Sequence, residues 1–362
     1  MKSYLHGIGL FQAENAMEQV KAAEIASELS GADARGTRRM NAVFRRAGVE
    51  SRSGVSMIEV DGRLEHRWIA ERKDGWEPCP GTGERIDQFM EIAPEMACIA
   101  AQKAMDEAKV DPSRVTHIVT ASCTGFASPG VDHLIIERLG LPRGTCRTNV
   151  GFMGCHAAIN ALRVAMSFAR SEPDAVVLVC CVEVCSLHFQ GGQTRDAMLA
   201  NALFADGAAA AIVTGEPPQD GEEIILDTTA SQFLPDSKDL MTWTVTDDGF
   251  RMTLDSSVPD RLRQSVGGWV GTWLESEGLT IPEMGAWAIH PGGPQILDAV
   301  RDALEIDETM CMSSRGILAR HGNMSSPTIL FVLDQLLRSG APRPWGVLAF
   351  GPGLGAEGLL IR

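Results

Sequence analysis

The chain of 362 residues lacks the features that mark membrane, secreted and nucleic-acid-binding proteins. No apolar run is long enough to span a membrane, and the N-terminus has no hydrophobic signal-peptide region. Lys and Arg number 32 against 47 Asp and Glu, and the net charge of −15 argues against nucleic acid as a partner. An anionic small substrate stays possible, because a local cluster of Arg can oppose the overall charge. We therefore expect a cytoplasmic globular protein without a membrane span.

The nine cysteines follow neither a zinc-binding nor a disulfide pattern. No C-x-x-C pair occurs, and Cys180 and Cys181 are adjacent within an apolar, strand-like run. Reduced thiols in the cytoplasm fit this usage better than disulfides or zinc. We expect no metal ion and no cofactor.

The chain also lacks a low-complexity segment or an obvious linker. The best candidate boundary is the stretch 215–221, which is rich in Gly, Pro and acidic residues and has an apolar run on each side. It divides the chain into an N-terminal half, residues 1–215, and a C-terminal half, residues 222–362.

The two halves share an order of elements, each consisting of a strand, a loop, a turn, a helix and two further strands. In the N-terminal half these are a strand over 116–120, a helix over 157–169 and strands over 175–181 and 208–213. In the C-terminal half they are a strand over 285–289, a helix over 327–337 and strands over 345–350 and 358–361.

The spacing of candidate site residues agrees between the halves. Cys123 and Cys155 are 32 residues apart, and His290 and Asn323 are 33 residues apart. This repeat predicts two α/β units related by a pseudo-twofold axis. Since ligand sites favour the ends of strands in such folds, Cys155, His290 and Asn323 could converge at matching ends of their sheets.

Cys155 lies at the predicted start of the helix over 157–169, where backbone N–H groups and the helix dipole favour a thiolate. This position predicts a lowered thiol pKa. Together, Cys155, His290 and Asn323 suit covalent acyl chemistry, because a thiolate attacks a thioester and the other two side chains can donate to an oxyanion or enolate. Each residue alone also fits a structural role, as a buried cysteine, a strand-end histidine or a helix-cap asparagine.

Several sequence blocks resemble the type III polyketide synthases, the chalcone-synthase-like enzymes of the thiolase-fold superfamily. The blocks are Gly154-Cys155, the segments 202–207, 287–294 (WAIHPGGP) and 322–326 (GNMSS), and Phe350-Gly-Pro-Gly-Leu354. The resemblance extends from about residue 40 to the C-terminus and is closer to bacterial members than to plant ones. It implies a thiolase-like fold with layers in the order α-β-α-β-α, and a homodimer.

The resemblance also implies the reaction. A starter acyl-CoA would acylate Cys155, and malonyl-CoA would then lose CO₂ to give an enolate that His290 and Asn323 stabilise. The enolate would attack the Cys155 thioester in a decarboxylative Claisen condensation. Repeated extension and cyclisation would follow, with acyl-CoA and malonyl-CoA as the partners and no acyl carrier protein.

Further residues match the family's cavity positions. Phe204 matches an aromatic gatekeeper, and Met252 stands where plant enzymes have a second gatekeeping Phe. The other cavity positions are Cys123, His188, Ser128, Glu183 and Ser325. Ser128 aligns with a residue that reaches into the partner subunit's cavity, and Glu183 and Ser325 align with positions that tune cyclisation.

The same resemblance places the binding site for CoA. Its basic residues match Arg39 and Arg46, while Ala42 replaces a third. The pantetheine arm would pass Gly292, Gly293 and Gln295.

Three alternatives stay open at this point. A ketoacyl-ACP synthase III-like enzyme would perform one condensation, but this group usually has His-Gln-Ala-Asn where this chain has the block at 290–294. A thiolase would need a C-terminal catalytic cysteine, and none follows Cys311. A non-catalytic thiolase-fold binding protein would be expected to lack one of Cys155, His290 and Asn323. The sequence leaves the starter, the number of extensions and the ring closure undetermined.

Overall fold

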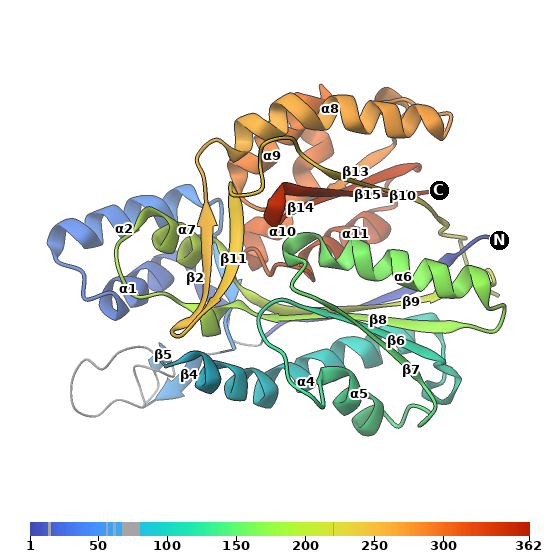
Figure 1. Ribbon diagram of the computed structural model, residues 1–362, viewed down its shortest axis with the longest axis horizontal. Coiled ribbons are helices and arrows are strands. Elements are labelled where there is room, and N and C mark those ends of the chain that lie inside the picture. The colour runs from blue at the N-terminus through green and yellow to red at the C-terminus, as the bar shows by residue number, and fades with distance from the viewer. Residues whose placement is uncertain (14–15, 56, 61–62, 67–79, 220) are drawn as a thin grey trace.

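Two β-sheets form the centre of the molecule (Figure 1). The computed structural model describes the chain except for residues 14–15, 56, 61–62, 67–79 and 220. The first sheet has five strands in the order β1-β9-β8-β6-β7. Their bounds are Tyr4–Phe11 (β1), Asp206–Thr214 (β9), Val176–Val184 (β8), His117–Ser122 (β6) and Cys146–Gly151 (β7).

The second sheet repeats the arrangement of the first. Its order is β10-β15-β14-β13, with bounds Leu226–Phe233 (β10), Gly355–Ile361 (β15), Trp345–Gly351 (β14) and Ala286–Ile289 (β13). In each sheet the first two pairings, β1-β9-β8 and β10-β15-β14, are antiparallel, and the next, β8-β6 or β14-β13, is parallel. The predicted repeat of two α/β units is confirmed.

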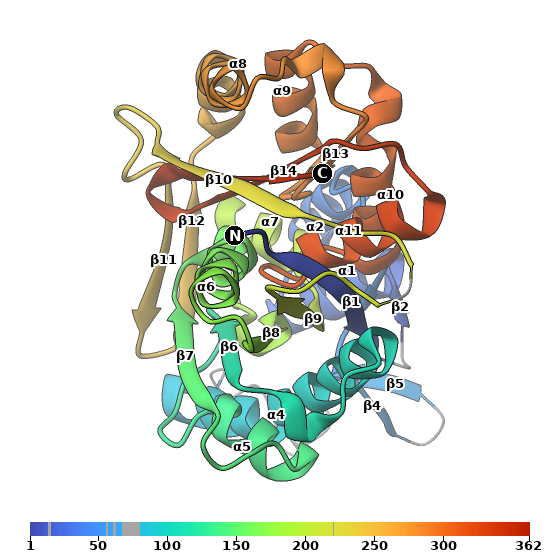
Figure 2. The ribbon, with the colours of Figure 1, turned by 90° about the vertical axis from the view of Figure 1, so that its right-hand side faces the viewer.

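Helices separate and cover the two sheets. Helices α6 (Ala157–Ser171) and α11 (Thr328–Ser339) lie between them and share one buried apolar cluster with both. The outer face of the first sheet is covered by α4 (Thr82–Ala108) and α5 (Val131–Leu139), and that of the second by α8 (Val258–Ser276) and α9 (Pro294–Leu304). Figure 2 shows the resulting α-β-α-β-α layers, which confirm the predicted architecture.

The composition of the central strands explains this burial. All residues of β8 and β9 are buried, and both strands are near-continuous runs of Ala, Val, Leu, Ile and Cys. Runs of this kind are typical of strands covered on both faces. The charged exceptions are Glu183 on β8 and Asp206 on β9, and both accept hydrogen bonds from neighbouring loops.

Smaller elements surround one end of the sheets. Helices α1 (Gln19–Leu29), α2 (Ala34–Arg46) and α7 (Arg195–Leu203) pack around a separate apolar cluster, and α10 (Met312–His321) precedes α11. Two-stranded pairs are formed by β2 (Ala16–Glu18) with β3 (Ser51–Ser53), β4 (Met57–Val60) with β5 (Arg63–His66), and β11 (Met241–Thr246) with β12 (Gly249–Leu254). The 3₁₀ turns are Pro112–Arg114 (η1), Gly154–His156 (η2), Cys185–His188 (η3), Ile281–Glu283 (η4), Glu308–Cys311 (η5) and Pro352–Leu354 (η6).

The predicted boundary over 215–221 falls between β9 and β10. The division into residues 1–215 and 222–362 stays a prediction, because α6 and α11, from opposite sides of that boundary, share one core. Within the described part of the chain, no helix is both long and apolar enough to cross a membrane.

Candidate active site

Cys155 lies in the turn η2, directly ahead of α6, as the sequence pattern predicts. Gly154 precedes it with φ +69°, and a Cβ built on Gly154 would lie 2.5 Å from Cδ of Pro352. Both facts require glycine at this position. The chain therefore enters the turn tightly, and the Cys155 side chain stays partly exposed toward a cavity.

Asn323 is fixed beside Cys155 by backbone pairing with the segment around Phe204. Asn323 N–H donates to the carbonyl of Leu203 at 2.8 Å, and Ala205 N–H donates to the carbonyl of Asn323 at 2.9 Å. The Asn323 side chain is hydrogen-bonded to the Cys155 thiol, and its Oδ1 accepts the N–H of Ser325 at 2.8 Å. The structure therefore brings Asn323 into contact with the sulfur.

His290 follows β13, and its ring is buried with both nitrogens unpartnered among the described residues. Burial, with a smaller contribution from the nearby His156, lowers the pKa of His290 to about 3. The imidazole is therefore neutral near pH 7 and keeps one N–H for donation. His156 directly follows Cys155 in η2, so the residue next to the thiol acts electrostatically on His290.

The prediction of a lowered thiol pKa at Cys155 is wrong. Burial raises the pKa of Cys155 to about 11, although hydrogen bonds from Ser325 and Asn323 lower it and thus oppose this effect. The reason is that desolvation disfavours the charged thiolate more than the turn and its hydrogen bonds favour it.

A second thiol, Cys123, belongs to a buried network around Glu183. The carboxylate of Glu183 accepts hydrogen bonds from Cys123 N–H at 3.0 Å, the Cys123 thiol at 3.3 Å, the Thr124 hydroxyl at 2.7 Å and the Ser326 hydroxyl at 2.6 Å. The Cys123 sulfur also lies 3.3 Å from Ser325 Oγ. Burial and the Glu183 charge raise the pKa of Cys123 well above its usual range, so this thiol is neutral.

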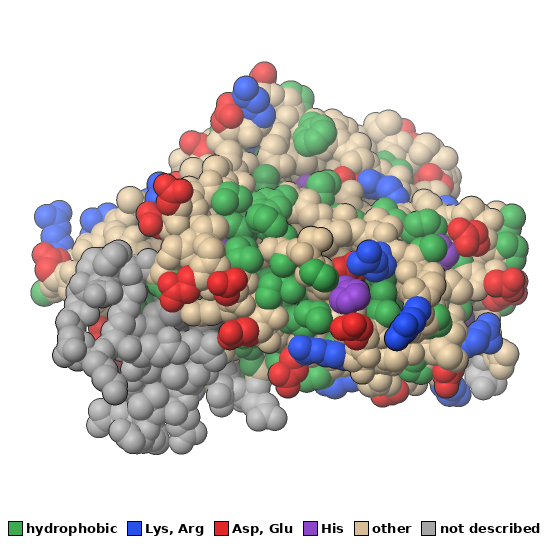
Figure 3. Space-filling model, turned by 60° about the horizontal axis from the view of Figure 1, so that its bottom comes forward, with side chains coloured by type: hydrophobic (Ala, Val, Ile, Leu, Met, Phe, Trp, Pro, Cys, Tyr) green, Lys and Arg blue, Asp and Glu red, His purple; other side chains and the backbone are tan. Residues whose placement is uncertain are grey.

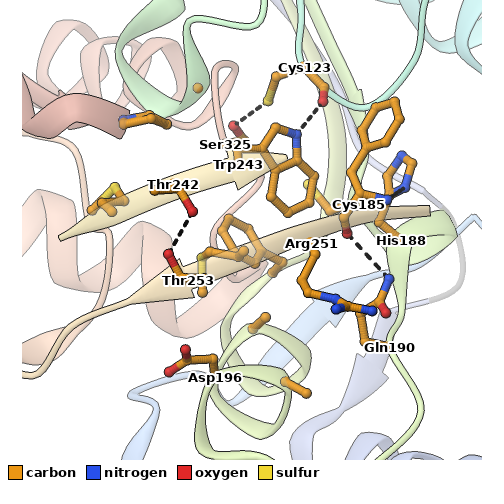
Figure 4. Close-up of a pocket in the computed structure, with 18 of the residues that line it drawn as sticks. Cys123, Cys185, His188, Gln190, Asp196, Thr242, Trp243, Arg251, Thr253 and Ser325 are labelled. Carbon is orange, nitrogen blue, oxygen red and sulfur yellow. Dashed lines mark hydrogen bonds between the residues drawn. The ribbon is translucent and has the colours of Figure 1, made fainter. Parts of the chain in front are cut away.

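A cavity of about 440 Å³ has Cys155 in its lining. Figure 4 shows other residues of this lining, among them Cys123, His188 and Trp243. The sequence-predicted residues that line the cavity are Cys155, Cys123, His188, Phe204, Met252 and Ser325. Glu183 does not line the cavity and is hydrogen-bonded to Cys123, which does, while Ser128 is exposed. His290 and Asn323 also lie behind the lining, with exposed fractions of 1% and 2%.

The hairpin β11–β12 supplies a wall of the cavity that the sequence analysis missed, apart from Met252. Trp243 and Phe250 lie on this wall, and Trp243 Nε1–H donates to the carbonyl of Cys123 at 2.7 Å (Figure 4). The sequence contains a pattern that predicts this hairpin, since alternating apolar residues flank an Asp-Gly pair at 248–249. The lining also includes four residues that the sequence did not predict, namely Cys185, Gln190, Asp196 and Arg251.

His188 connects this hairpin to the loop after β6. Its Nε2 lies 2.5 Å from the Thr124 carbonyl, and its Nδ1 accepts the N–H of Phe250 at 3.1 Å. Burial lowers the pKa of His188 to about 4, which matches a neutral ring that donates at one nitrogen and accepts at the other. His188 thus lines the cavity and also fixes the hairpin.

A smaller cavity of about 220 Å³ lies on the other side of α7. The predicted CoA-binding residues Arg46, Gly292, Gly293 and Gln295 line it, whereas Arg39 is exposed on α2 and does not. Arg195 also lines this cavity, and the sequence analysis missed it. Residues 195, 199 and 203 of α7 face this cavity, and residues 196, 197 and 200 face the cavity at Cys155.

The described residues contain no group of three or more His, Cys, Asp or Glu side chains able to hold a metal ion. The eight cysteines among them are free thiols.

Comparisons with known proteins agree with this geometry. Sequence models described as the N-terminal and C-terminal domains of chalcone and stilbene synthases match residues 76–217 and 225–362. The "Alpha-pyrone synthesis polyketide synthase-like Pks18" of Mycobacterium tuberculosis is 33% identical over 285 residues, covering 77% of this chain and 72% of that protein. The "1,3,6,8-tetrahydroxynaphthalene synthase" of Streptomyces peucetius subsp. caesius is 33% identical over 285 residues, covering 77% and 76%.

Among solved structures, PKS-I from the brown alga Ectocarpus siliculosus superposes with a TM-score of 0.91. It is 25% identical in sequence, and the match covers 100% of this chain and 98% of that one. The fold is therefore the thiolase-like fold that the family resemblance implies.

Proposed function

Because this chain belongs to the chalcone and stilbene synthase family and is a type III polyketide synthase, we propose that it extends an acyl group held as a thioester on Cys155. One observation carries the assignment of these residues. The Cys155 thiol, at the wall of a cavity of about 440 Å³, is hydrogen-bonded to Asn323, and His290 is buried and neutral with no partner among the described residues. The family match favours this reaction over a single ketoacyl-ACP condensation and over a non-catalytic role.

The first step is acyl transfer from the starter. The Cys155 thiolate attacks the carbonyl carbon of an acyl-CoA, the C–S bond to CoA breaks, and CoA leaves as a thiol with the proton that Cys155 gave up. His290 and Asn323 carry N–H donors, and one or both would stabilise the oxyanion of the tetrahedral intermediate. Their burial strengthens such hydrogen bonds, because few water molecules compete.

The second step is decarboxylative condensation. Malonyl-CoA loses CO₂, and the electron pair of the broken C–C bond forms an enolate on the acetyl-CoA fragment. The enolate carbon attacks the thioester carbonyl, a new C–C bond forms, and Cys155 leaves as a thiolate. In this step His290 and Asn323 would hold the enolate oxygen, and Phe204, which lines the Cys155 cavity, would act as its gate.

CoA itself is proposed to occupy the cavity of about 220 Å³ beyond α7. Gly292 and Gly293 leave room for the pantetheine arm, and Gln295 offers an amide to it. Arg46, with Arg39 seven residues earlier on α2, would face the phosphates. Arg195 supplies a further cation on the opposite rim.

A homodimer is proposed as the assembly. Strand β7 is the edge of the first sheet, with most of its side chains exposed, and no other described strand pairs with its outer side. Phe126 and Phe152 are exposed on the loops beside β6 and β7, at 55% and 37%. Figure 3 shows hydrophobic side chains gathered near the middle of a face of the molecule. Unpaired edges and exposed aromatic residues favour pairing with a second copy about a twofold axis.

The cytoplasm is the proposed location, since the free thiols of the described cysteines fit a reducing compartment.

The deciding experiment incubates the protein with malonyl-CoA and a panel of short, long and aromatic acyl-CoA starters and identifies products by mass spectrometry. The panel also includes malonyl-CoA without a second starter. The relatives are named for different products, an α-pyrone and a tetrahydroxynaphthalene, so the starters are varied widely. We expect release of CoA and CO₂ with at least one starter, and no product from Cys155→Ala. Product formation by Cys155→Ala would overturn the proposal.

A further inference from the structure

Arg52, on β3, is a buried cation that the condensation chemistry described above does not use. Its exposed fraction is 5%, and its Cζ lies 5.5 Å from the ring centroid of Phe44. Burial lowers the pKa of Arg52 to about 10, so the guanidinium stays charged at neutral pH. A buried charge is costly unless hydrogen bonds satisfy it, which makes the partners of Arg52 informative.

The partners of Arg52 are backbone carbonyls at the end of α7. Nη1 donates to the carbonyl of Asn201 at 2.7 Å and to that of Phe204 at 2.8 Å, and Nη2 donates to the carbonyl of Ala202 at 2.5 Å. Nη2 also donates to Oε1 of Gln19, whose Nε2 donates to the same Ala202 carbonyl at 2.9 Å. Carbonyls in the last turn of a helix lack intrahelical partners, and a cation there also complements the helix dipole.

The carbonyl of Leu203, the remaining one in residues 201–204, connects this segment to Asn323. Leu203 O accepts the N–H of Asn323, and Ala205 N–H donates to Asn323 O, so the backbone of Asn323 is held on both sides. The four carbonyls of residues 201–204 are thus divided between Arg52 and Asn323. Both Phe204 and Asn323 therefore take their position from a segment that Arg52 fixes.

A second buried charge extends this network. Asp206 accepts hydrogen bonds from Ser186 N–H at 2.8 Å, the Ser186 hydroxyl at 2.6 Å and Val55 N–H at 2.9 Å. Ser186 belongs to η3, the turn that also carries the cavity residues Cys185 and His188. Arg52 and Asp206 attract each other electrostatically, and together they hold two segments of the cavity wall.

Free space lies beside the fixed backbone. A cavity of about 70 Å³ is lined by Arg52, Ala200 and Phe204, and the last two also line the cavity at Cys155. Arg52 Nε–H has no partner among the described residues. The Phe204 side chain therefore borders both cavities, while a hydrogen bond from Arg52 holds its backbone carbonyl.

We propose that Arg52 is a positioning residue of the condensation reaction, which fixes the backbone of residues 201–204 and thereby the Phe204 gate and Asn323. This inference rests on the proposed roles of Phe204 and Asn323. Lys cannot replace Arg here, because a single ammonium group cannot span carbonyls that a planar guanidinium reaches from two nitrogens.

The test compares Arg52→Lys and Arg52→Met with Arg170→Lys. Arg170 is a matched control, since its guanidinium also donates to backbone carbonyls, those of Leu226 and Asp227, away from the cavity. A displacement near 1 Å at a reacting group can cost about 100-fold in rate. We expect kcat for malonyl-CoA decarboxylation to fall about 10- to 100-fold in both Arg52 variants, with KM changed less than about 3-fold, and the Arg170 variant to keep the wild-type kcat.

Arg52 variants with the kcat of the Arg170 variant would overturn the proposal. If Arg52→Met does not fold, Gln19→Leu is tested in its place. This variant keeps the Arg52 charge and removes the side chain that bonds both Arg52 and the Ala202 carbonyl. An unchanged kcat in Gln19→Leu would also overturn the proposal. A readout independent of turnover is the rate at which iodoacetamide alkylates Cys155, which depends on the Asn323 hydrogen bond. We expect it to fall several-fold in Arg52→Lys and not in Arg170→Lys, even if the wild-type protein forms no polyketide.

Discussion

At the residue scale, burial and hydrogen bonding act on Cys155 in opposite directions. Burial raises its thiol pKa to about 11, while Ser325 and Asn323 lower it. Ser325 reaches this position with a φ of +57°, which is strained for a residue other than glycine, and its N–H is held by Asn323 Oδ1. The Cys155 thiol is therefore neutral near pH 7.

Alkylation of Cys155 tests this balance. Because the thiol pKa is near 11, we expect the iodoacetamide rate to rise about tenfold per pH unit between pH 7 and 10. Ser325→Ala removes a hydrogen bond to the thiolate, worth about 1 kcal/mol, and should slow alkylation at pH 8 about 5-fold. Ser27→Ala is the control, because the buried Ser27 hydroxyl donates to the carbonyl of Ala23 within α1, away from the cavity. Equal rates in Ser325→Ala and the wild type would contradict this account.

The positions of the proposed reacting residues could be predicted from the sequence better than their surroundings. Cys155 and Asn323 were predictable because each lies in a short local motif at a turn before a helix. The pKa of Cys155 could not be predicted, because it depends on the groups that bury the sulfur, and these come from distant parts of the chain. Arg52 was missed for the same reason, since its carbonyl partners lie about 150 residues later.

At the scale of elements, the hairpin β11–β12 decides the shape of the cavity. Trp243 pairs with Met252 across the two strands, and both face the cavity. The hairpin is fixed to the rest of the protein through the Trp243 bond to Cys123 and the Phe250 bond to His188. Its position is thus set by a backbone carbonyl and a histidine side chain of the N-terminal half, and a strand pattern alone could not place it against Cys155.

Enlarging Met252 tests the role of this wall. Met252→Trp should reduce the free volume and shift the products toward fewer malonyl extensions, as measured by mass spectrometry of the polyketides from one starter. Thr244→Trp is the matched control, because Thr244 lies on β11, is exposed and does not line the cavity. An unchanged product profile in Met252→Trp would show that this side chain does not limit chain length.

At the scale of the whole molecule, the order and spacing of apolar segments predicted the repeat, and the family resemblance implied the layer order and a homodimer. Neither located a dimer interface. The proposed dimer depends on the outer edge of β7 and on Phe126 and Phe152, which lie 5.7 Å apart between ring centroids. Exposed aromatic residues in loops give no periodic signal in a sequence. Their clustering becomes visible only once β6 and β7 are placed side by side.

Charges placed in this cluster test the dimer. We expect Phe126→Asp combined with Phe152→Asp to convert a dimer of the wild-type protein to a monomer, as measured by light scattering after size-exclusion chromatography. Phe233→Asp is the control, because Phe233 is more exposed, at 77%, and lies on β10 in the other sheet. A double variant with the wild-type mass would contradict the proposed interface.

Buried histidines couple the fold to pH. Burial lowers the pKa of His188 to about 4 from the ordinary 6.5, so between these values the unfolded chain binds a proton that the folded chain does not. The contribution of His188 to the free energy of unfolding is therefore full above pH 6.5. Between pH 6.5 and 4 it falls by about 1.4 kcal/mol for each pH unit. Asp206 acts in the opposite direction, since burial raises its pKa to about 6. A comparison of variants is therefore needed to separate the contribution of His188 to stability from that of Asp206.

His188→Asn provides that comparison, because the amide can still donate to Thr124 and accept from Phe250 while it cannot be protonated. Between pH 6.5 and 5, we expect wild-type stability to fall about 2 kcal/mol more than that of the variant, as measured by urea unfolding. His133→Asn, on exposed α5, is the control and should follow the wild type. If the His188 variant instead loses stability in parallel with the wild type, the ring is protonated as readily in the folded protein as in the unfolded chain. The neutral connection between the hairpin and Thr124 would then be wrong.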